Sequence, residues 1–70
     1  MATTTERSQR VRSLREGKGW SRQTLARKAG VSEATVARIE LYGQDVKLST
    51  WEAMADALGT PLTELVGEAA

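Results

Sequence analysis

The sequence has no cysteine, no histidine and no phenylalanine among its 70 residues, and it has a single proline. Without cysteine it can form neither a disulfide bond nor a thiolate nucleophile, and without histidine it has no imidazole base. The two absences also exclude most zinc sites, so we expect no metal, no cofactor and no catalytic residue. An enzyme would need carboxylates or lysine in a cleft, and this length leaves little room for one. We therefore expect that the protein is not an enzyme.

Long apolar segments are also missing. No run approaches the ~20 apolar residues of a membrane helix, and the N-terminal stretch MATTTERSQR lacks the apolar segment of a signal peptide. These features predict a cytoplasmic protein without a membrane partner. The length predicts one domain over residues 1–70, with residues 1–4 and 67–70 frayed.

The net charge is only +1, but its distribution along the chain is uneven. Residues 1–30 carry eight basic and two acidic residues, a net +6, whereas residues 31–70 carry two basic and seven acidic residues, a net −5. A polyanion such as nucleic acid would be attracted to the first half. The alternative is an ordinary solvated surface on a small helical protein.

Apolar residues at helical spacing predict an all-α fold with five helices and no strand. The predicted helices cover residues 6–16, 22–29, 33–41, a segment that starts after Ser49, and a segment opened by Thr60 and Pro61. Ser49 and Glu52 have the spacing of a capping box. Proline suits the first position of a helix because its missing N–H has no partner there anyway.

The most informative stretch is SRQTLARKAGVSEATVARIE, residues 21–40. It has the pattern of two short amphipathic helices joined by a tight turn at Gly30. Ser21 and Ser32 stand where a hydroxyl can cap the first turn of each helix. Glycine tolerates the positive φ that a sharp turn between helices requires. This is the pattern of a helix-turn-helix, whose second helix commonly enters the DNA major groove.

Five segments in order carry a resemblance to a known family: RVRSLRE, WSRQTLA, GVS with TVARIE, LSTWEAMADALG, and PLTEL. With them the chain resembles the Cro/phage-repressor (Xre-type) helix-turn-helix family over nearly its whole length. The resemblance implies a five-helix, lambda-repressor-like DNA-binding domain with a central helix-turn-helix. It also implies that Trp20 is a core residue wedged between the first two helices.

The resemblance places the base-contacting positions at the start of the third helix and one turn later. The matching residues here are Glu33, Ala34, Ala37 and Arg38. Arginine can pair with guanine, glutamate can accept from cytosine N4, and alanine can contact a thymine methyl group. Glu33 is equally suited to stabilise the helix dipole from the first turn, so both roles stay open for it.

The same resemblance implies contacts to DNA phosphates. The candidates for these contacts are Arg22, Gln23, Ser32, Thr35 and Lys47. The hydroxyl of Ser32 serves equally well as a helix cap alone. Many members of the family carry several basic residues after the recognition helix, but here residues 41–46 have none and include Asp45. Fewer phosphate contacts predict weaker binding by a monomer and a shallower salt dependence.

Two further groups of residues have structural roles by resemblance and pattern. Arg15 and Glu40 match positions that face each other across the first and third helices, which predicts a partly buried ion pair. The candidate dimer interface consists of Leu62, Leu65, Val66 and Trp51. For each of these four, burial in the core of the same chain is the alternative.

The function expected from these observations is sequence-specific binding of double-stranded DNA by a small Cro-like or Xre-type repressor of phage or bacterial origin. We expect helix 33–41 to lie in the major groove and the protein to act as a homodimer, at least on DNA. The alternative is an antitoxin or protein-interaction module of the same fold, with a toxin or another protein as its partner and weak DNA binding.

Overall fold

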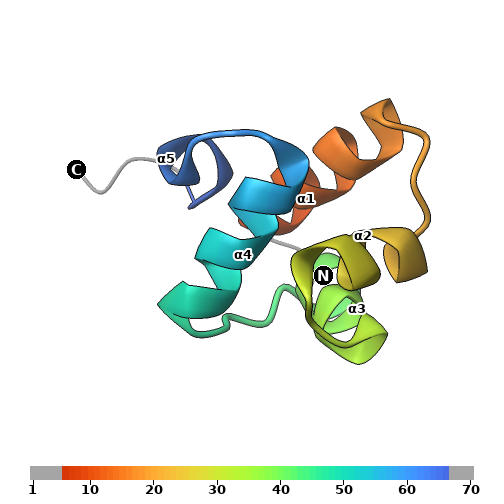
Figure 1. The fold of residues 1–70 in the computed structure, drawn as a ribbon. Coiled ribbons are helices and arrows are strands. Elements are labelled where there is room, and N and C mark those ends of the chain that lie inside the picture. The colour runs from red at the N-terminus through yellow and green to blue at the C-terminus, as the bar shows by residue number, and fades with distance from the viewer. Residues whose placement is uncertain (1–5, 67–70) are drawn as a thin grey trace.

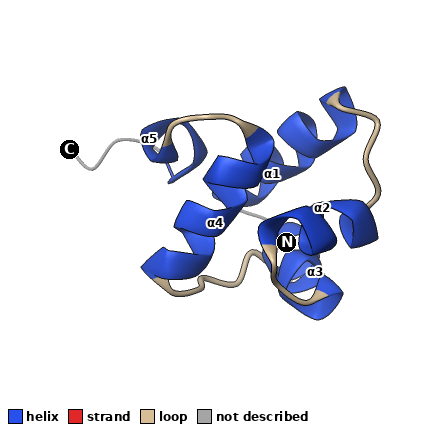
Figure 2. Ribbon diagram, viewed as in Figure 1, coloured by secondary structure: helices blue, strands red, loops and turns tan. Residues whose placement is uncertain are grey.

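The computed structural model describes residues 6–66, and within that range every regular element is an α-helix (Figures 1 and 2). The five helices are α1 (Glu6–Gly17), α2 (Arg22–Ala29), α3 (Glu33–Tyr42), α4 (Leu48–Leu58) and α5 (Leu62–Val66). The predicted all-helical fold with five helices is confirmed. The predicted frayed ends, residues 1–4 and 67–70, lie outside the described range.

Short-range hydrogen bonds set the ends of α2 and α3. Ser21 precedes α2, and its Oγ accepts from the backbone N–H of Thr24 at 3.1 Å. Ser32 precedes α3 and makes the same bond with Thr35, also at 3.1 Å. Each bond satisfies an amide that the first helical turn leaves without a partner. Gly30 ends α2 with φ of +73°, a left-handed conformation that strains any residue with a Cβ atom.

All five helices contribute to one core. Helix α2 packs against α3 and α4, α1 packs against α3 and α5, and α4 packs against α5. The buried apolar side chains are Val11, Leu25, Ala26, Val36, Ile39, Trp51, Met54, Ala55, Leu58 and Leu65. Trp20, predicted to be a core residue, packs against this cluster but is only partly buried. Helix α2 is therefore packed between α3 and α4, and α3 between α1 and α2.

The start of α4 differs from the sequence prediction. The helix begins at Leu48, and the residue at its N-cap is Lys47, which makes no side-chain capping bond. The capping box expected between Ser49 and Glu52 is therefore wrong. The carbonyl of Lys47 already accepts from the amides of Thr50 (3.0 Å) and Trp51 (3.1 Å), so Ser49 lies inside the first turn.

Three other helix ends differ from the prediction by one residue, whereas both ends of α2 and the starts of α1 and α3 agree with it. Helix α1 extends to Gly17, and α3 extends to Tyr42 because Gly43, with φ of +64°, provides its left-handed C-cap. Pro61 precedes α5 rather than opening it, and its carbonyl accepts from the amide of Glu64 at 3.0 Å. Within residues 6–66, no helix is long and apolar enough to cross a lipid bilayer.

Candidate nucleic-acid interface

The turn between α2 and α3 is closed by its own backbone. The amide of Gly30 caps the carbonyls of Ala26 and Arg27, and the amide of Val31 donates to the Ala26 carbonyl at 3.0 Å. This is the pattern of a Schellman-type helix end. Ser32 then caps α3, and only residues 30–32 join the two helices. The short connection fixes the direction in which α3 presents its outer surface.

The expected base-contacting residues occupy that outer surface. Glu33, Ala34 and Arg38 are exposed, and Ala37 is partly buried. The opposite side of α3 is buried through Val36, Ile39 and Glu40. Within residues 6–66, neither Glu33 nor Arg38 has a side-chain hydrogen bond or an ion pair. Their polar ends are therefore available to an external partner.

Three of the polar candidates gather where the N-terminal ends of α2 and α3 approach each other. Arg22, Gln23 and Glu33 line one cleft of about 300 Å³, together with Ser21 and Arg15. Arg22 is partly buried, and its Nε atom is buried without a hydrogen-bond partner among the described residues. A buried N–H without an acceptor is unfavourable, so a ligand oxygen that enters this cleft would satisfy it.

The remaining phosphate candidates lie elsewhere. Ser32 Oγ accepts the Thr35 amide and lies 2.9 Å from Thr35 Oγ1, so both hydroxyls take part in the cap of α3. Lys47 is exposed at the start of α4 and is not part of the cleft that holds Arg22. The structure therefore separates the phosphate candidates into a group at the helix-turn-helix and a single cation beyond α3.

Arg15 and Glu40 form a bidentate ion pair beneath this surface. Arg15 Nε donates to Glu40 Oε2 at 2.8 Å, and Nη2 donates to Oε1 at 2.9 Å. Nη1 donates to the carbonyl of Trp20 at 2.6 Å. The hydrogen bond to Glu40 raises the pKa of Arg15 above its ordinary value, against the opposing effect of burial. The pair is more deeply buried than the sequence predicts, since the side chains are only 9% and 1% exposed.

The four residues expected at a dimer interface differ in accessibility. Trp51 and Leu65 are 3% and 0% exposed, so they belong to the core of the chain. Leu62 and Val66 are partly buried against that core. A contact with a second copy through this group would therefore be made by the exposed parts of Leu62 and Val66.

Sequence reasoning missed the interactions of Asp45 and Arg7. Asp45 lies in the segment after α3 and accepts hydrogen bonds from Trp51 and Arg7. Arg7 and Asp45 are 38 residues apart, and no local pattern connects them. Only the packing of α1 beside the end of α3 brings these two residues together.

Two capped helices joined by a glycine turn, with Glu33 and Arg38 exposed on the second helix, have the geometry of a helix-turn-helix domain. Comparison with known families agrees with this class: the helix-turn-helix family HTH_3 matches residues 11–65. The chain belongs to this family.

Relatives and solved structures support the assignment. The chain is 38% identical over 60 residues to an immunity repressor protein of Bacillus phage phi105, an alignment that covers 86% of the chain and 42% of the repressor. The chain spans about half the length of the curated relatives it matches. It is 36% identical to the restriction-modification controller protein C.AhdI from Aeromonas hydrophila, with a TM-score of 0.79 over 84% of the chain and 89% of that structure.

The N-terminal DNA-binding domain of SinR from Bacillus subtilis is also similar. It is 30% identical, with a TM-score of 0.83 over 89% of the chain and 91% of that domain. A chain of the complex of SinR protein and SinI protein is similar as well, at 31% identity and a TM-score of 0.81 over 87% of the chain and 60% of that chain.

Proposed function

We propose that the protein is a sequence-specific regulator of transcription, a repressor that binds double-stranded DNA with α3 in the major groove. The observation that carries the proposal is the outer surface of α3, where Glu33, Ala34 and Arg38 are exposed and the two charged side chains have no partner within residues 6–66. An immunity repressor and the DNA-binding domain of SinR are among the similar proteins, which supports the same function here.

Each residue has a role set by its chemistry. Arg38 can donate two hydrogen bonds to guanine O6 and N7, and Glu33 can accept from cytosine N4. Ala34 and Ala37 can contact thymine methyl groups. Glu33 also retains its alternative role, because it lies in the first turn of α3, where a carboxylate stabilises the helix dipole. Arg22 and Gln23 would contact the phosphates beside the groove, where the unpartnered Arg22 Nε needs an acceptor.

We propose that the active form is a homodimer on a near-palindromic site. One recognition helix covers only a few base pairs, and α3 carries a single basic residue. Two copies would double the phosphate contacts and place their helices in successive major grooves, about 34 Å apart. Sedimentation of the free protein and of its complex should give two protein chains per site. A one-to-one complex on a full site would contradict the dimer.

Selection of bound sequences from random duplexes tests the proposal as a whole. The expected result is an enriched site with two related half-sites, because each copy of α3 would contact the same bases. A matched selection with Arg38→Gln should lose preference at one base pair in each half-site, whereas Arg27→Gln should retain the preference, because Arg27 lies on α2 rather than α3. Recovery of random sequence from the wild-type selection would contradict sequence-specific binding.

A second candidate function is an antitoxin or a module that binds another protein. The observations that favour it are the net −5 charge of residues 31–70 and the similarity to SinR in its complex with SinI protein. Gel shift with random duplex DNA at low salt separates the two functions. Retardation that weakens steeply with salt supports the regulator, and no retardation at any salt concentration supports the protein-interaction module.

A further inference from the structure

The segment after α3, residues 43–47, is anchored through Asp45. Its Oδ1 atom accepts from the indole Nε1 of Trp51 at 3.0 Å and from the backbone amide of Val46 at 3.0 Å. Trp51 belongs to the buried core, so this bond ties the segment directly to α4. The Asp45 side chain is nevertheless 74% exposed, and its charge faces the surrounding solvent.

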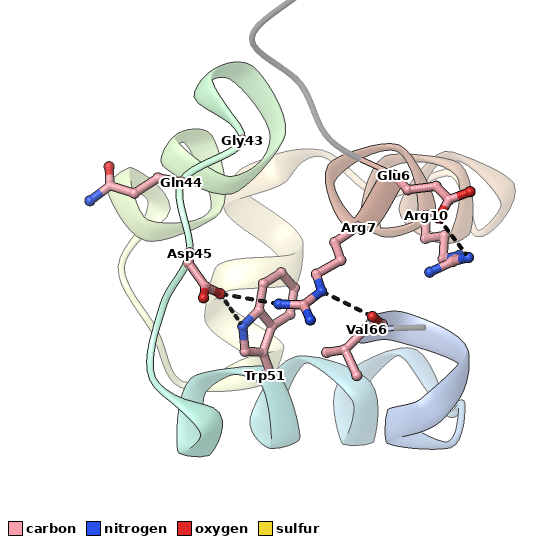
Figure 3. Close-up of a pocket in the computed structure, with 8 residues that line it drawn as sticks. All are labelled: Glu6, Arg7, Arg10, Gly43, Gln44, Asp45, Trp51 and Val66. Atoms are coloured by element: carbon pink, nitrogen blue, oxygen red, sulfur yellow. Dashed lines mark hydrogen bonds and ion pairs between the residues drawn. The ribbon is translucent and has the colours of Figure 1, made fainter. Parts of the chain in front are cut away.

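Arg7 extends from α1 to the same carboxylate (Figure 3). Its Nη1 lies 3.4 Å from Asp45 Oδ1, and its Nε donates to the carbonyl of Val66, the last described residue of α5, at 2.9 Å. The guanidinium also lies over the Trp51 ring, 5.8 Å from its centroid. These residues line a cleft of about 350 Å³. Arg7 therefore connects α1, the segment after α3, α4 and α5.

The contact between Arg7 and Asp45 changes the net charge at the segment after α3. Residues 43–47 contain one cation, Lys47, and one anion, Asp45, so their own charges cancel. When the guanidinium of Arg7 is included, the group has a net charge of +1. The structure thus places beside the segment a cation that the local sequence does not supply.

The position of the segment follows from the length of α3. Ten helical residues extend about 15 Å, slightly more than the ~12 Å width of the major groove. If α3 lies across the groove, a chain that leaves its C-terminal end emerges at the groove edge, where the phosphates lie. At that position an unneutralised carboxylate would repel the DNA.

We propose that Arg7 is a positioning residue for DNA binding. It neutralises Asp45 and holds residues 43–47 against the core, so that this segment can approach the phosphates that flank the groove and Lys47 can contact them. The proposal rests on the proposed function, because it requires α3 to lie in the major groove. Asp45 then has two opposing effects: it anchors the segment through Trp51, and its charge weakens DNA binding.

The test compares Arg7→Gln, Arg7→Lys, Asp45→Asn and the double variant Arg7→Gln/Asp45→Asn. Fluorescence anisotropy with a labelled duplex of random sequence gives the affinity of each variant as a function of salt. The matched control is Arg12→Gln, which removes the same charge from the same helix, where Arg12 pairs with Glu16 instead. The indole N–H signal of Trp51 in NMR spectra reports whether the anchor to residue 45 survives.

The expected changes have opposite signs. One phosphate contact contributes about 0.9 to the salt slope, or about threefold in affinity between ~50 and ~200 mM salt. Arg7→Gln should lower the affinity and reduce the salt slope by about 0.9. Asp45→Asn should raise both by the same amount, because asparagine keeps an acceptor for Trp51 but loses the charge. Each difference from the wild type should therefore be about threefold larger at ~50 than at ~200 mM salt. Arg7→Lys should retain the wild-type slope, and the double variant should bind like the wild type.

The following results would overturn the proposal. If Asp45→Asn weakens binding while the Trp51 signal is retained, or if Arg7→Gln has no more effect than Arg12→Gln, the contact between Arg7 and Asp45 has only a structural role. If Arg7→Gln fails to fold, Asp45→Asn decides alone. If the wild-type protein binds no duplex at low salt, the proposed function itself fails, and this inference fails with it.

Discussion

The buried ion pair between Arg15 and Glu40 gives the sharpest prediction for stability. Glu40→Ala removes both acceptors from a guanidinium that is 8% exposed as a residue and leaves it only the Trp20 carbonyl and a glutamate oxygen 3.8 Å away. Breaking a buried pair from one side costs about 3–5 kcal/mol. A chain of this size has a total unfolding free energy of roughly 4–10 kcal/mol, so Glu40→Ala should lose a third or more of it.

Urea denaturation followed by circular dichroism measures the loss. The control is Glu16→Ala, which breaks the exposed pair with Arg12 at 3.1 Å and should cost less than about 1 kcal/mol. Replacing both partners, Arg15→Met with Glu40→Met, should recover much of the stability, because no buried charge then lacks a partner. The reasoning is refuted if Glu40→Ala behaves like Glu16→Ala, or if the double variant is no more stable than Glu40→Ala.

Three further predictions concern the helix ends and the candidate interface. Gly30→Ala should lower the free energy of unfolding by about 1–2 kcal/mol, because the φ of Gly30 is +73° and alanine is strained there. Its control, Gly17→Ala, should leave that free energy unchanged or raise it by up to about 1 kcal/mol, because Gly17 has no positive φ and has open space around it. Ser32→Ala should cost about 1 kcal/mol through the lost cap, whereas Ser49→Ala should change the unfolding free energy by less than about 0.5 kcal/mol; equal losses in urea denaturation would contradict the placement of the α4 cap. Arg22→Ala should weaken binding to all duplexes alike and lower the salt slope by about one unit, and an effect limited to one base pair in anisotropy titrations would show that Arg22 contacts a base instead.

The sequence predicted the features that depend on neighbouring residues. Ser21, Ser32 and Gly30 each act through hydrogen bonds or a backbone angle within four residues, so their patterns identify the ends of α2 and the start of α3. The prediction failed at Ser49, although its spacing to Glu52 is correct for a capping box. In the structure the N-cap is Lys47, two residues before the N-cap position that the box requires, and the Lys47 carbonyl accepts the first hydrogen bonds of the helix.

Only part of the candidate site could likewise be predicted from the sequence. The family pattern places Glu33, Ala34 and Arg38 on α3, and the periodicity of the helix is enough to put them on its exposed side. The cleft that joins Arg22 to Glu33 depends on how α2 and α3 approach each other, which a single sequence does not specify. The contact between Arg7 and Asp45 depends on the packing of α1 near the end of α3, so it has no signal in the sequence.

The structure shows that part of the positive charge in the first half of the chain is paired with carboxylates. Every arginine of α1 is within 4 Å of a carboxylate oxygen: Arg7 contacts Asp45, and the other three arginines pair with Glu6, Glu16 and Glu40. Half of the basic residues in the first thirty are therefore neutralised within the chain. Among residues 6–66, the cations without an ion pair are Lys18, Arg22, Arg27, Lys28, Arg38 and Lys47.

These unpaired cations change where a polyanion should be attracted. Four of the six lie on α2 and α3, the two helices of the helix-turn-helix, together with the unpaired Glu33. The four arginines of α1, whose own net charge is +2, all have carboxylate partners. An approaching polyanion therefore meets most of the uncompensated positive charge at the two central helices. The same pairing explains how a protein with a net charge of only +1 can still attract DNA, because attraction depends on where the unpaired charges lie rather than on their sum over the chain.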